Sequence, residues 1–435
     1  MNAPLHHERP TPLLDAAQAR ARIDAQWDGD ILRQLTDYIA IPAKSPVFDP
    51  DWAAHGFIDT VVRHAADWVQ AQKVPGLTLE VVRLPGRTPV IFFEIPATRA
   101  GSTQTALLYG HLDKQPEFTG WRADLGPWTP KYEDGKLYGR GGADDGYAVY
   151  AAIAAVQALK AQGLPHPRIV GLIETSEESG SPDLLPYIDA LRPRLGDVGL
   201  VVCLDSGAGN YDQFWLTTSL RGNITGTLKV EVLTEGVHSG DASGLVPSSF
   251  RILRQVLERL EDSASGRLLP PGLHCDTPAE RVAQARATAA ILGDDLFKRF
   301  PWVHYDCGGR EQSVLPMTDD PVDALLEDNA PYQARVTFES LGAATGWNAP
   351  DSAPWFAQAL HAASHAHFGA PCGYIGQGGT IPLMNQLSQG FPSAQMMVCG
   401  VLGPRSNAHG PNEFLHVPYA KRLTAAVAEV IARMP

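Results

Sequence analysis

Two adjacent carboxylates, Glu177 and Glu178, stand in the segment IETSEESGS (173–181), directly after an apolar run. Neighbouring carboxylates repel each other, so the pair indicates either an exposed loop that tolerates charge or a site where a cation removes the repulsion. For an isolated pair, the solvated loop is the commoner case. The positions of the other acidic and imidazole side chains decide between these two interpretations.

Groups that can bind a metal follow each of four predicted apolar strands. They are His111 and Asp113 after LLYG, Glu177 and Glu178 after VGLIE, Asp205 after LVVCL, and His409 in the loop after MMVCGVL; a further segment, LYGRGGADDG, adds Asp144 and Asp145 before a predicted buried helix. A lone His-x-Asp is more often structural, and an Asp-Asp pair before a helix is usually a cap. Because sites in open α/β sheets form at the carboxyl ends of strands, the groups together predict one convergent site.

The donor set of this site suits a pair of zinc ions. Two histidines and three carboxylates supply the nitrogen and oxygen ligands that zinc accepts. One carboxylate and one water could bridge metals ~3.5–4 Å apart. One glutamate of the 177–178 pair would then bind metal, while its neighbour takes the proton of the attacking water. The chemistry indicated is hydrolysis.

Alternating strands and helices are expected to position these residues. Strands are predicted at 78–95 (two strands around a Pro-Gly turn), 105–110, 168–174, 198–204 and 394–402, and helices at 14–42, 57–73, 147–161, 355–369 and 419–433. Apolar runs without polar alternation are typical of strands buried on both faces. The pattern predicts an α/β fold with a mixed sheet that helices cover on both faces.

Residues 221–340 have a different pattern. The segment 226–233 alternates polar and apolar residues, as a half-exposed strand does. The helix after it has one predicted apolar stripe, made of Phe250, Leu253, Val256, Leu257 and Leu260. This pattern predicts a smaller α+β domain, residues 221–340, inserted between two parts of a catalytic domain, residues 1–220 and 341–435.

The composition argues against several classes of partner. The 435-residue chain has 35 basic and 48 acidic residues, a formal charge of −13, and no basic cluster, so neither nucleic acid nor an anionic membrane is expected to bind. Five cysteines without a CxxC pair indicate reduced thiols. The N-terminus lacks the pattern of a secretion signal and no apolar run approaches ~20 residues, so a soluble, cytoplasmic protein is expected.

The motifs of the chain, taken together, resemble those of the M20 family of dinuclear zinc peptidases, which includes carboxypeptidases, dipeptidases and aminoacylases. The matching segments stand in the family's order from about residue 100 onward: GHLD (110–113), LYGRGGADDG (137–146), ETSEESGS (174–181), LDSG (204–207), GVHSG (236–240), GQGGTIP (376–382) and SNAHGPNEF (406–414). The resemblance implies a zinc-peptidase catalytic domain with an inserted lid and dimerisation domain.

The resemblance also implies a set of ligands for two Zn²⁺ ions, which Co²⁺ or Mn²⁺ could replace. The implied ligands are His111, Asp144, Glu178, Asp205 and His409. Asp144 would bridge the ions, Glu177 would be the general base, and Asp113 would orient His111. The family usually has a cis peptide bond between the two aspartates of the 144–145 pair.

Two further motifs imply contacts with the substrate. His238, in the inserted domain, would reach across a homodimer formed by that domain and stabilise the oxyanion. The turn Gly378-Gly379-Thr380 would line the substrate pocket.

The chain departs from the family pattern in three places. The family usually continues Asp-Asp-Lys-Gly, whereas here Asp145 is followed by Gly146 and Tyr147. The residues after His-x-Asp in HLDKQPEF differ from the sequence that is commoner in dipeptidases. The late strand whose arginine grips the substrate carboxylate, with the helix after it, is not found between Leu326 and Glu327.

The function expected is that of a zinc metallopeptidase that cleaves dipeptides or short peptides through a zinc-bridged water, as a dipeptidase or a carboxypeptidase. An N-acyl-amino-acid amidohydrolase, similar to the aminoacylases, is the first alternative. The second is a catalytically silent member that binds peptides. The intact Glu177 favours an active enzyme, and the missing arginine strand favours the silent one.

Overall fold

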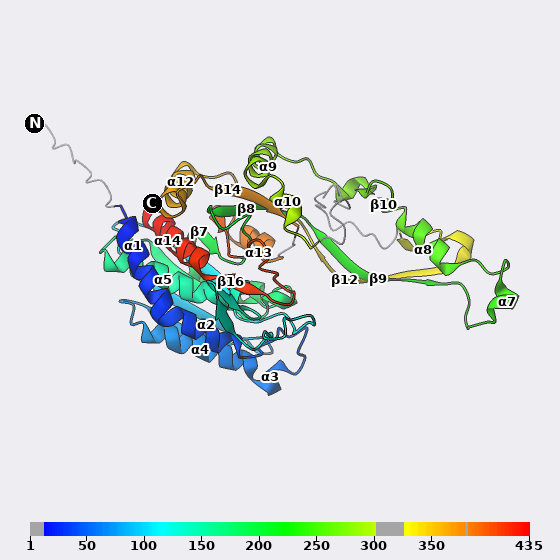
Figure 1. Ribbon diagram of the computed structural model, residues 1–435, viewed down its shortest axis with the longest axis horizontal. Helices are drawn as coiled ribbons and strands as arrows, with labels where there is room; N and C mark the ends of the chain where they lie inside the picture. The colour runs from blue at the N-terminus through cyan, green and yellow to red at the C-terminus, as the bar shows by residue number, and fades with distance from the viewer. Residues whose placement is uncertain (1–12, 302–325, 379–381) are drawn as a thin grey trace, which may run out of the picture. The chain divides into compact units, whose positions relative to one another are not determined.

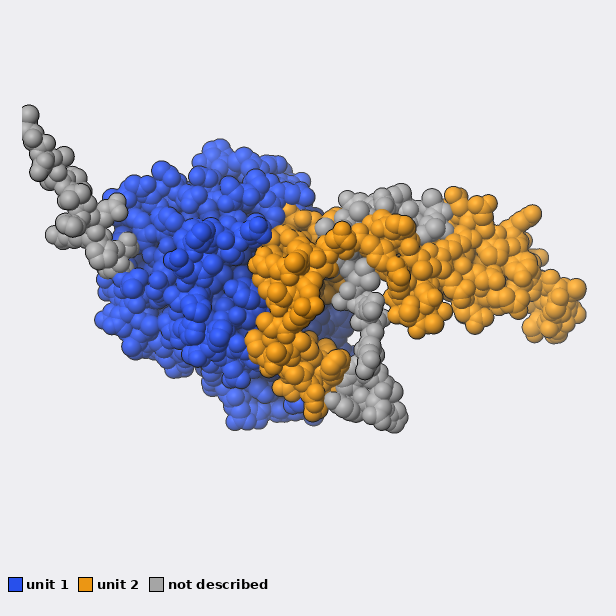
Figure 2. Space-filling view, turned by 90° about the horizontal axis from the view of Figure 1, so that it is seen from above, with its two compact units in different colours: residues 1–217, 350–374, 386–435 blue, residues 218–349, 375–385 orange. Residues whose placement is uncertain are grey.

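The computed structural model describes residues 13–301, 326–378 and 382–435, and the chain divides into two compact units (Figure 2). Unit 1 consists of residues 1–217, 350–374 and 386–435, and unit 2 of residues 218–349 and 375–385. Unit 2 therefore starts and ends somewhat outside the predicted 221–340. It also takes in 375–385, which the sequence pattern assigned to the second part of the catalytic domain.

A six-stranded sheet forms the centre of unit 1 (Figure 1). Its strand order is β1-β2-β6-β3-β7-β15. Its strands are β1 (Thr78–Val82), β2 (Val90–Ile95), β3 (Gln104–His111), β6 (Arg168–Glu174), β7 (Asp197–Cys203) and β15 (Gln395–Val398). β2 is antiparallel to β1 and β6, whereas β6, β3, β7 and β15 are parallel neighbours. The parallel strands are apolar and buried along almost their whole length, which confirms the predicted mixed α/β fold.

Helices pack on this sheet and on one another. α5 (Tyr147–Ala161) is buried on nearly every side, as predicted, and packs against β3, while α4 (Phe57–Ala71) packs against β1 and β2. The C-terminal helix α14 (Val417–Arg433) packs against α5, α12 (Pro354–Phe368) and α1 (Ala16–Gln26). Within the described ranges, none of the helices combines the length and the hydropathy that crossing a bilayer requires.

The helix predicted at 14–42 is continuous and contains a π-helical turn in its middle. After α1, the chain continues through η1 (Trp27–Ile31) into α2 (Leu32–Ile39). The other elements of unit 1 are α3 (Trp52–His55), η2 (Gly142–Gly146), η3 (Glu177–Ser179), α6 (Leu184–Leu195) and a small antiparallel sheet of β4 (Lys131–Glu133), β5 (Lys136–Tyr138) and β16 (Phe414–His416). Because β16 pairs with β5, this small sheet brings the motifs at 137–146 and 406–414 side by side.

Unit 2 has its own small core around an antiparallel pair of strands, β9 (Asn223–Glu231) and β12 (Arg335–Ala344). α8 (Ser249–Leu257) packs its Ile252 and Val256 into this core, together with Leu326 and Val336. The predicted apolar stripe is wrong in part, because Phe250 is 78% exposed and Leu257 is 44% exposed. A two-stranded sheet is narrow, since strands lie only ~4.8 Å apart, so it covers a narrow face of the helix.

The described residues form several further elements. They are β8 (Trp215–Leu220), α7 (Ser239–Ala242), β10 (Glu261–Asp262), β11 (Arg267–Leu268), η4 (Pro271–Leu273), α9 (Ala279–Leu292), α10 (Asp295–Lys298), η6 (Pro331–Gln333), β13 (Trp347–Asn348), β14 (Gly373–Gln377) and α13 (Pro382–Gly390).

Candidate metal centre

Three of the predicted ligand segments follow adjacent parallel strands of the central sheet. His111 is the last residue of β3, Asp205 stands two positions after β7, and the Glu177-Glu178 pair lies in the η3 turn after β6. Because β6, β3 and β7 are parallel neighbours, their carboxyl ends meet at one edge of the sheet. The fourth segment, with Asp144, lies in η2 at the start of α5, the helix that packs against β3.

Local packing explains the glycine that departs from the family pattern after the two aspartates. A Cβ at Gly146 would lie 2.1 Å from Cε1 of Tyr38, so this position has no room for any side chain. The hydroxyl of Tyr38 donates a hydrogen bond to the carbonyl oxygen of Leu112 (3.0 Å), which holds the ring in place. The peptide bond between Asp144 and Asp145 is cis, as the resemblance implied.

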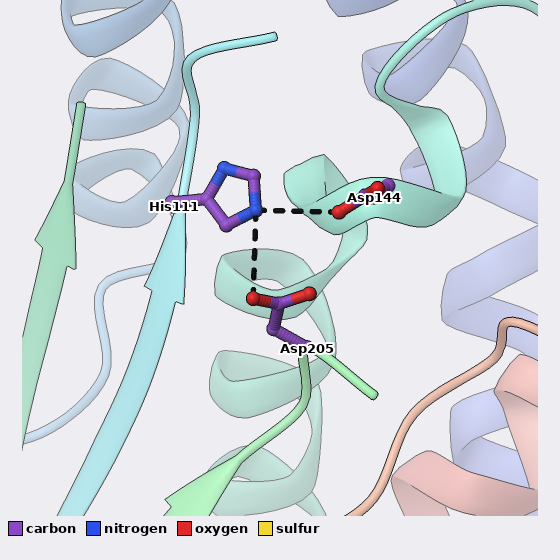
Figure 3. Close-up of side chains that lie close together, drawn as sticks. All are labelled: His111, Asp144 and Asp205. Carbon is purple, nitrogen blue, oxygen red and sulfur yellow. Dashed lines mark ion pairs between the residues drawn. The ribbon is translucent and has the colours of Figure 1, made fainter. Parts of the chain in front are cut away.

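One group of possible ligands is buried: His111, Asp144 and Asp205 (Figure 3). Nε2 of His111 lies 3.4 Å from Oδ1 of Asp144 and 3.8 Å from Oδ2 of Asp205. Although buried, this nitrogen has no hydrogen-bond partner among the described residues. A buried nitrogen that faces two carboxylates without a bond is well suited to bind a cation.

The other ring nitrogen of His111 is occupied. Nδ1 lies 3.1 Å from the carbonyl oxygen of Asp113 and 3.5 Å from its Oδ1. A carbonyl oxygen only accepts hydrogen bonds, so Nδ1 carries the proton and the lone pair of Nε2 points toward the two carboxylates. This is the second-sphere arrangement that typically orients a metal-binding histidine.

The second group consists of Asp144, Glu178 and His409. Nε2 of His409 lies 2.9 Å from Oδ2 of Asp144 and 3.4 Å from Oε2 of Glu178. The two groups share Asp144, which turns Oδ1 toward His111 and Oδ2 toward His409. A carboxylate with one oxygen for each histidine has the geometry of a bridging ligand.

Glu177 lies beside the first group, with its Oε2 4.0 Å from Nε2 of His111, but it belongs to neither ligand group of the described chain. Its backbone N–H donates to Oδ1 of Asp113 (3.1 Å), and the N–H of Glu178 donates to Oδ2 of the same carboxylate (3.0 Å). Asp113 therefore contacts both the His111 ring and the turn that carries the two glutamates. The sequence predicted only the contact with His111.

The electrostatics of the site favour a bound cation. Burial raises the pKa values of Glu177 and Glu178 well above the ordinary range, and nearby carboxylates raise them further. Burial also raises the pKa of Asp205, to about 7. For Asp144, burial acts in the same direction, but the neighbouring imidazoles of His111 and His409 outweigh it and hold the pKa below its ordinary value. Crowded buried carboxylates must either keep protons or gain cations, and two histidines among them fit a metal such as zinc.

His238 and Gly378, two more of the predicted site residues, lie in unit 2 and in neither ligand group. His238 caps α7, where Nδ1 accepts a hydrogen bond from the N–H of Gly240 (3.2 Å), and its side chain is 78% exposed. The carbonyl oxygen of Gly378 accepts a hydrogen bond from Nε of Arg221 (2.6 Å). Gly379 and Thr380 lie outside the described residues. The roles of all four residues stay predictions.

Several side chains that support the ligands were not predicted. Nε2 of Gln115 donates to Oε2 of Glu178 (2.5 Å). The buried carboxylate of Glu174 accepts hydrogen bonds from Tyr109 (2.6 Å), Ser176 (3.1 Å) and Ser181 (2.9 Å), so it ties both ends of the η3 turn to the sheet. The sequence could have indicated these supporting residues, because they lie within or next to the quoted motifs.

A sheet edge with two histidine–carboxylate groups around one shared aspartate is an arrangement of metal-dependent hydrolases. A family model described as Peptidase family M20/M25/M40 matches residues 107–433. The chain belongs to this peptidase family, which confirms the resemblance in the sequence, and it is accordingly a metallopeptidase.

Individual relatives agree with this assignment. The chain is 25% identical over 411 residues to a cysteinylglycine-S-conjugate dipeptidase of Corynebacterium striatum, covering 84% of this chain and 89% of that protein. It is 32% identical over 264 residues to a human Beta-Ala-His dipeptidase, covering 58% of this chain and 50% of that protein.

Solved structures show the same fold. The chain is similar to the di-peptidase Dug1p of Saccharomyces cerevisiae, with a TM-score of 0.70 at 23% identity over 97% of this chain and 99% of that chain. It is also similar to human carnosine dipeptidase 1, with a TM-score of 0.72 at 22% identity over 96% of this chain and all (100%) of that chain.

Proposed function

We propose that the protein is a dipeptidase that hydrolyses dipeptides or short peptides with two zinc ions, one in each histidine–carboxylate group. The shared Asp144 is the observation that carries the proposal, because its two oxygens face His111 and His409 at 3.4 and 2.9 Å. Relatives named as dipeptidases support a peptide as the substrate.

Glu177 is the general base in this proposal. Bound zinc ions would polarise the scissile carbonyl and lower the pKa of an attacking water. The carboxylate of Glu177 takes the proton of this water and passes it to the leaving amine. The position of Glu177 supports this role, since it lies 4.0 Å from His111 and outside both ligand groups of the described chain. Its hydrogen bond to Asp113 holds its backbone in place.

In this proposal, unit 2 forms the contact between the subunits of a homodimer and supplies a second functional residue, His238. His238 would stabilise the oxyanion of the partner subunit's reaction, and the turn at 378–380 would line the pocket. In the described part of unit 2, β9 and β12 pair only with each other, so each has a free edge that a second chain could extend. Exposed apolar side chains in this unit, such as Leu245 and Phe250, also favour an interface.

A cytoplasmic location forms part of the same proposal. The four cysteines of the described residues, Cys203, Cys275, Cys372 and Cys399, are free thiols. Free thiols are typical of a reducing compartment.

A substrate panel tests the proposal. The metal-loaded protein is assayed on dipeptides, including Cys-Gly and β-Ala-His, on longer peptides with free carboxyl ends, and on N-acyl amino acids, with Glu177→Gln as the inactive control. The highest kcat/KM is expected for a dipeptide. Faster cleavage of longer peptides would indicate a carboxypeptidase, and faster cleavage of N-acyl amino acids an amidohydrolase. Metal binding without any turnover would indicate a silent, peptide-binding member.

A further inference from the structure

The loop that carries His409 has an unusual backbone. Four of its non-glycine residues have positive φ angles: Arg405 (65°), Asn407 (55°), His409 (62°) and Asn412 (61°). L-residues rarely adopt this left-handed conformation, because their Cβ atoms crowd the backbone. Contacts around the loop must therefore stabilise it.

The guanidinium of Arg140 contacts this loop just after His409, at Gly410 and Glu413. Arg140 is 1% exposed, and its NH1 forms an ion pair with Oε2 of the fully buried Glu413. Its NH2 donates to the carbonyl oxygen of Gly410 (2.9 Å), the residue after His409. Its Nε donates to the carbonyl oxygen of Pro116 (3.2 Å). One buried cation thus contacts the loop of His409 and the segment that follows Asp113.

Glu413 completes the connection in the opposite direction. Its Oε1 accepts a hydrogen bond from the N–H of Gly141 (3.0 Å), and its carbonyl oxygen accepts one from the N–H of Gly139 (3.0 Å). The pairing of Phe414 with Tyr138 continues this contact into the small sheet. Arg140 and Glu413 are 273 positions apart, and the pair therefore joins the loop of His409 to the loop that leads to Asp144.

A buried ion pair by itself is a weak source of stability, because removing two charges from water offsets much of their attraction. Its better-supported use is to specify one arrangement of the chain, and here the pair is fully bonded to the backbone of both loops. His111 has no comparable dependence on it, since His111 ends a central strand and is oriented by Asp113.

We propose that Arg140 and Glu413 are positioning residues that set the affinity of the His409 group for its metal ion and leave the His111 group largely unaffected. The inference rests on the proposed two-metal function. Without the pair, the loop relaxes toward ordinary backbone angles, and the imidazole of His409 loses its fixed place 2.9 Å from Asp144.

Calorimetric titration of the metal-free protein with Zn²⁺ tests this proposal. Wild-type protein is expected to bind two ions per chain. Glu413→Gln and Arg140→Lys should bind one ion with unchanged affinity and the other about 10–100-fold more weakly, as expected when a supporting partner of a ligand is lost. Activity of these variants should return at saturating zinc. Unchanged affinity for both ions, or an equal loss for both, would overturn the proposal.

Glu94→Gln is the matched control. Glu94 pairs with Arg168, the first residue of β6, whereas the ligands gather at the opposite, carboxyl end of that strand. Its removal breaks the ion pairs of unit 1 with Arg168 and with Arg194, but both zinc affinities should stay at the wild-type value.

Two further measurements separate positioning from loss of the fold. Thermal unfolding of the metal-free variants shows whether they fold, and the double variant Arg140→Met/Glu413→Leu replaces the ion pair with an apolar pair that buried sites often tolerate. It should fold and still show the selective loss of affinity. In a His409→Ala background, Glu413→Gln should have no further effect on the remaining ion; an additional loss would contradict the proposal. If wild-type protein itself fails to bind two ions, the proposed function fails instead.

Discussion

The two histidines that face Asp144 are held in different ways. His111 is fully buried at the end of a central strand, with one ring nitrogen fixed by Asp113. His409 is 53% exposed in a loop with several left-handed residues, and a buried ion pair links that loop to a distant segment. The sheet prepares the first ligand, whereas contacts between distant loops prepare the second. The two metal ions that we propose should therefore differ in affinity and in their sensitivity to mutation.

Removal of the shared ligand should abolish the difference between the two groups. Asp144→Asn replaces one oxygen of the carboxylate that faces both histidines, so both ions should be lost and hydrolysis should fall to background. Metal analysis and kcat measure this effect. Chelation should have the same result in wild-type protein, and zinc, cobalt or manganese should restore its activity. Full activity of metal-free protein would contradict the whole proposal.

The two adjacent glutamates should separate catalysis from metal binding. Glu177→Gln should keep both ions while kcat falls by roughly 10²–10⁴, the range for a lost general base. Glu178→Gln should lower the affinity of the His409 group for its metal ion, because Glu178 lies 3.4 Å from His409. The measurements are metal content and kcat at saturating zinc. Equal behaviour of the two variants would mean that the roles are assigned wrongly.

A third region, unit 2, can be tested without disturbing either ligand group. His238→Ala should lower kcat about 10²–10³-fold, the usual effect of removing a donor to an oxyanion, and leave the zinc content unchanged. Mixing this variant with Glu177→Gln protein should restore part of the activity, since hybrid dimers contain one site with both groups intact. Exchange of subunits without any recovery would show that His238 does not act across an interface.

Acid should release metal and also lower the stability of the fold. A titratable group outside the metal site, His367, can report the loss of stability separately. Burial lowers the pKa of His367 to about 4, from 6.5, and nearby Arg20 acts in the same direction. Glu429 lies 3.9 Å away but is already paired with Arg433 (2.6 Å), so it offsets little of this effect.

Because the folded-state pKa of His367 is the lower one, its contribution to stability is complete above pH 6.5 and is lost as the pH falls toward 4. One pKa unit corresponds to about 1.4 kcal/mol, so the loss approaches ~3 kcal/mol. Unfolding of metal-free protein between pH 7 and 4 measures it. His367→Gln should have a shallower pH dependence, and an unchanged slope would rule out His367 as the cause.

Sequence patterns predicted the sheet and the convergence of the candidate ligands because both depend on local features. Apolar runs identified the parallel strands, and strand ends identified His111, Asp205 and the glutamate pair. The supporting residues could not be predicted in the same way, since no local pattern shows that Arg140 pairs with Glu413, 273 positions away. The stripe of α8 was wrong for a related reason: periodicity shows that a helix is amphipathic, but not how wide a surface covers it.

The contacts of the Asp113 carboxylate affect how constant the spacing between the site residues is. Each of its oxygens accepts one backbone N–H, from Glu177 and from Glu178, while the same residue contacts the ring of His111. Asp113 thus contacts the proposed base and one possible ligand of each group, Glu178 and His111. A displacement of the turn is therefore expected to move the proposed base and its neighbouring glutamate together, which keeps the spacing between them constant.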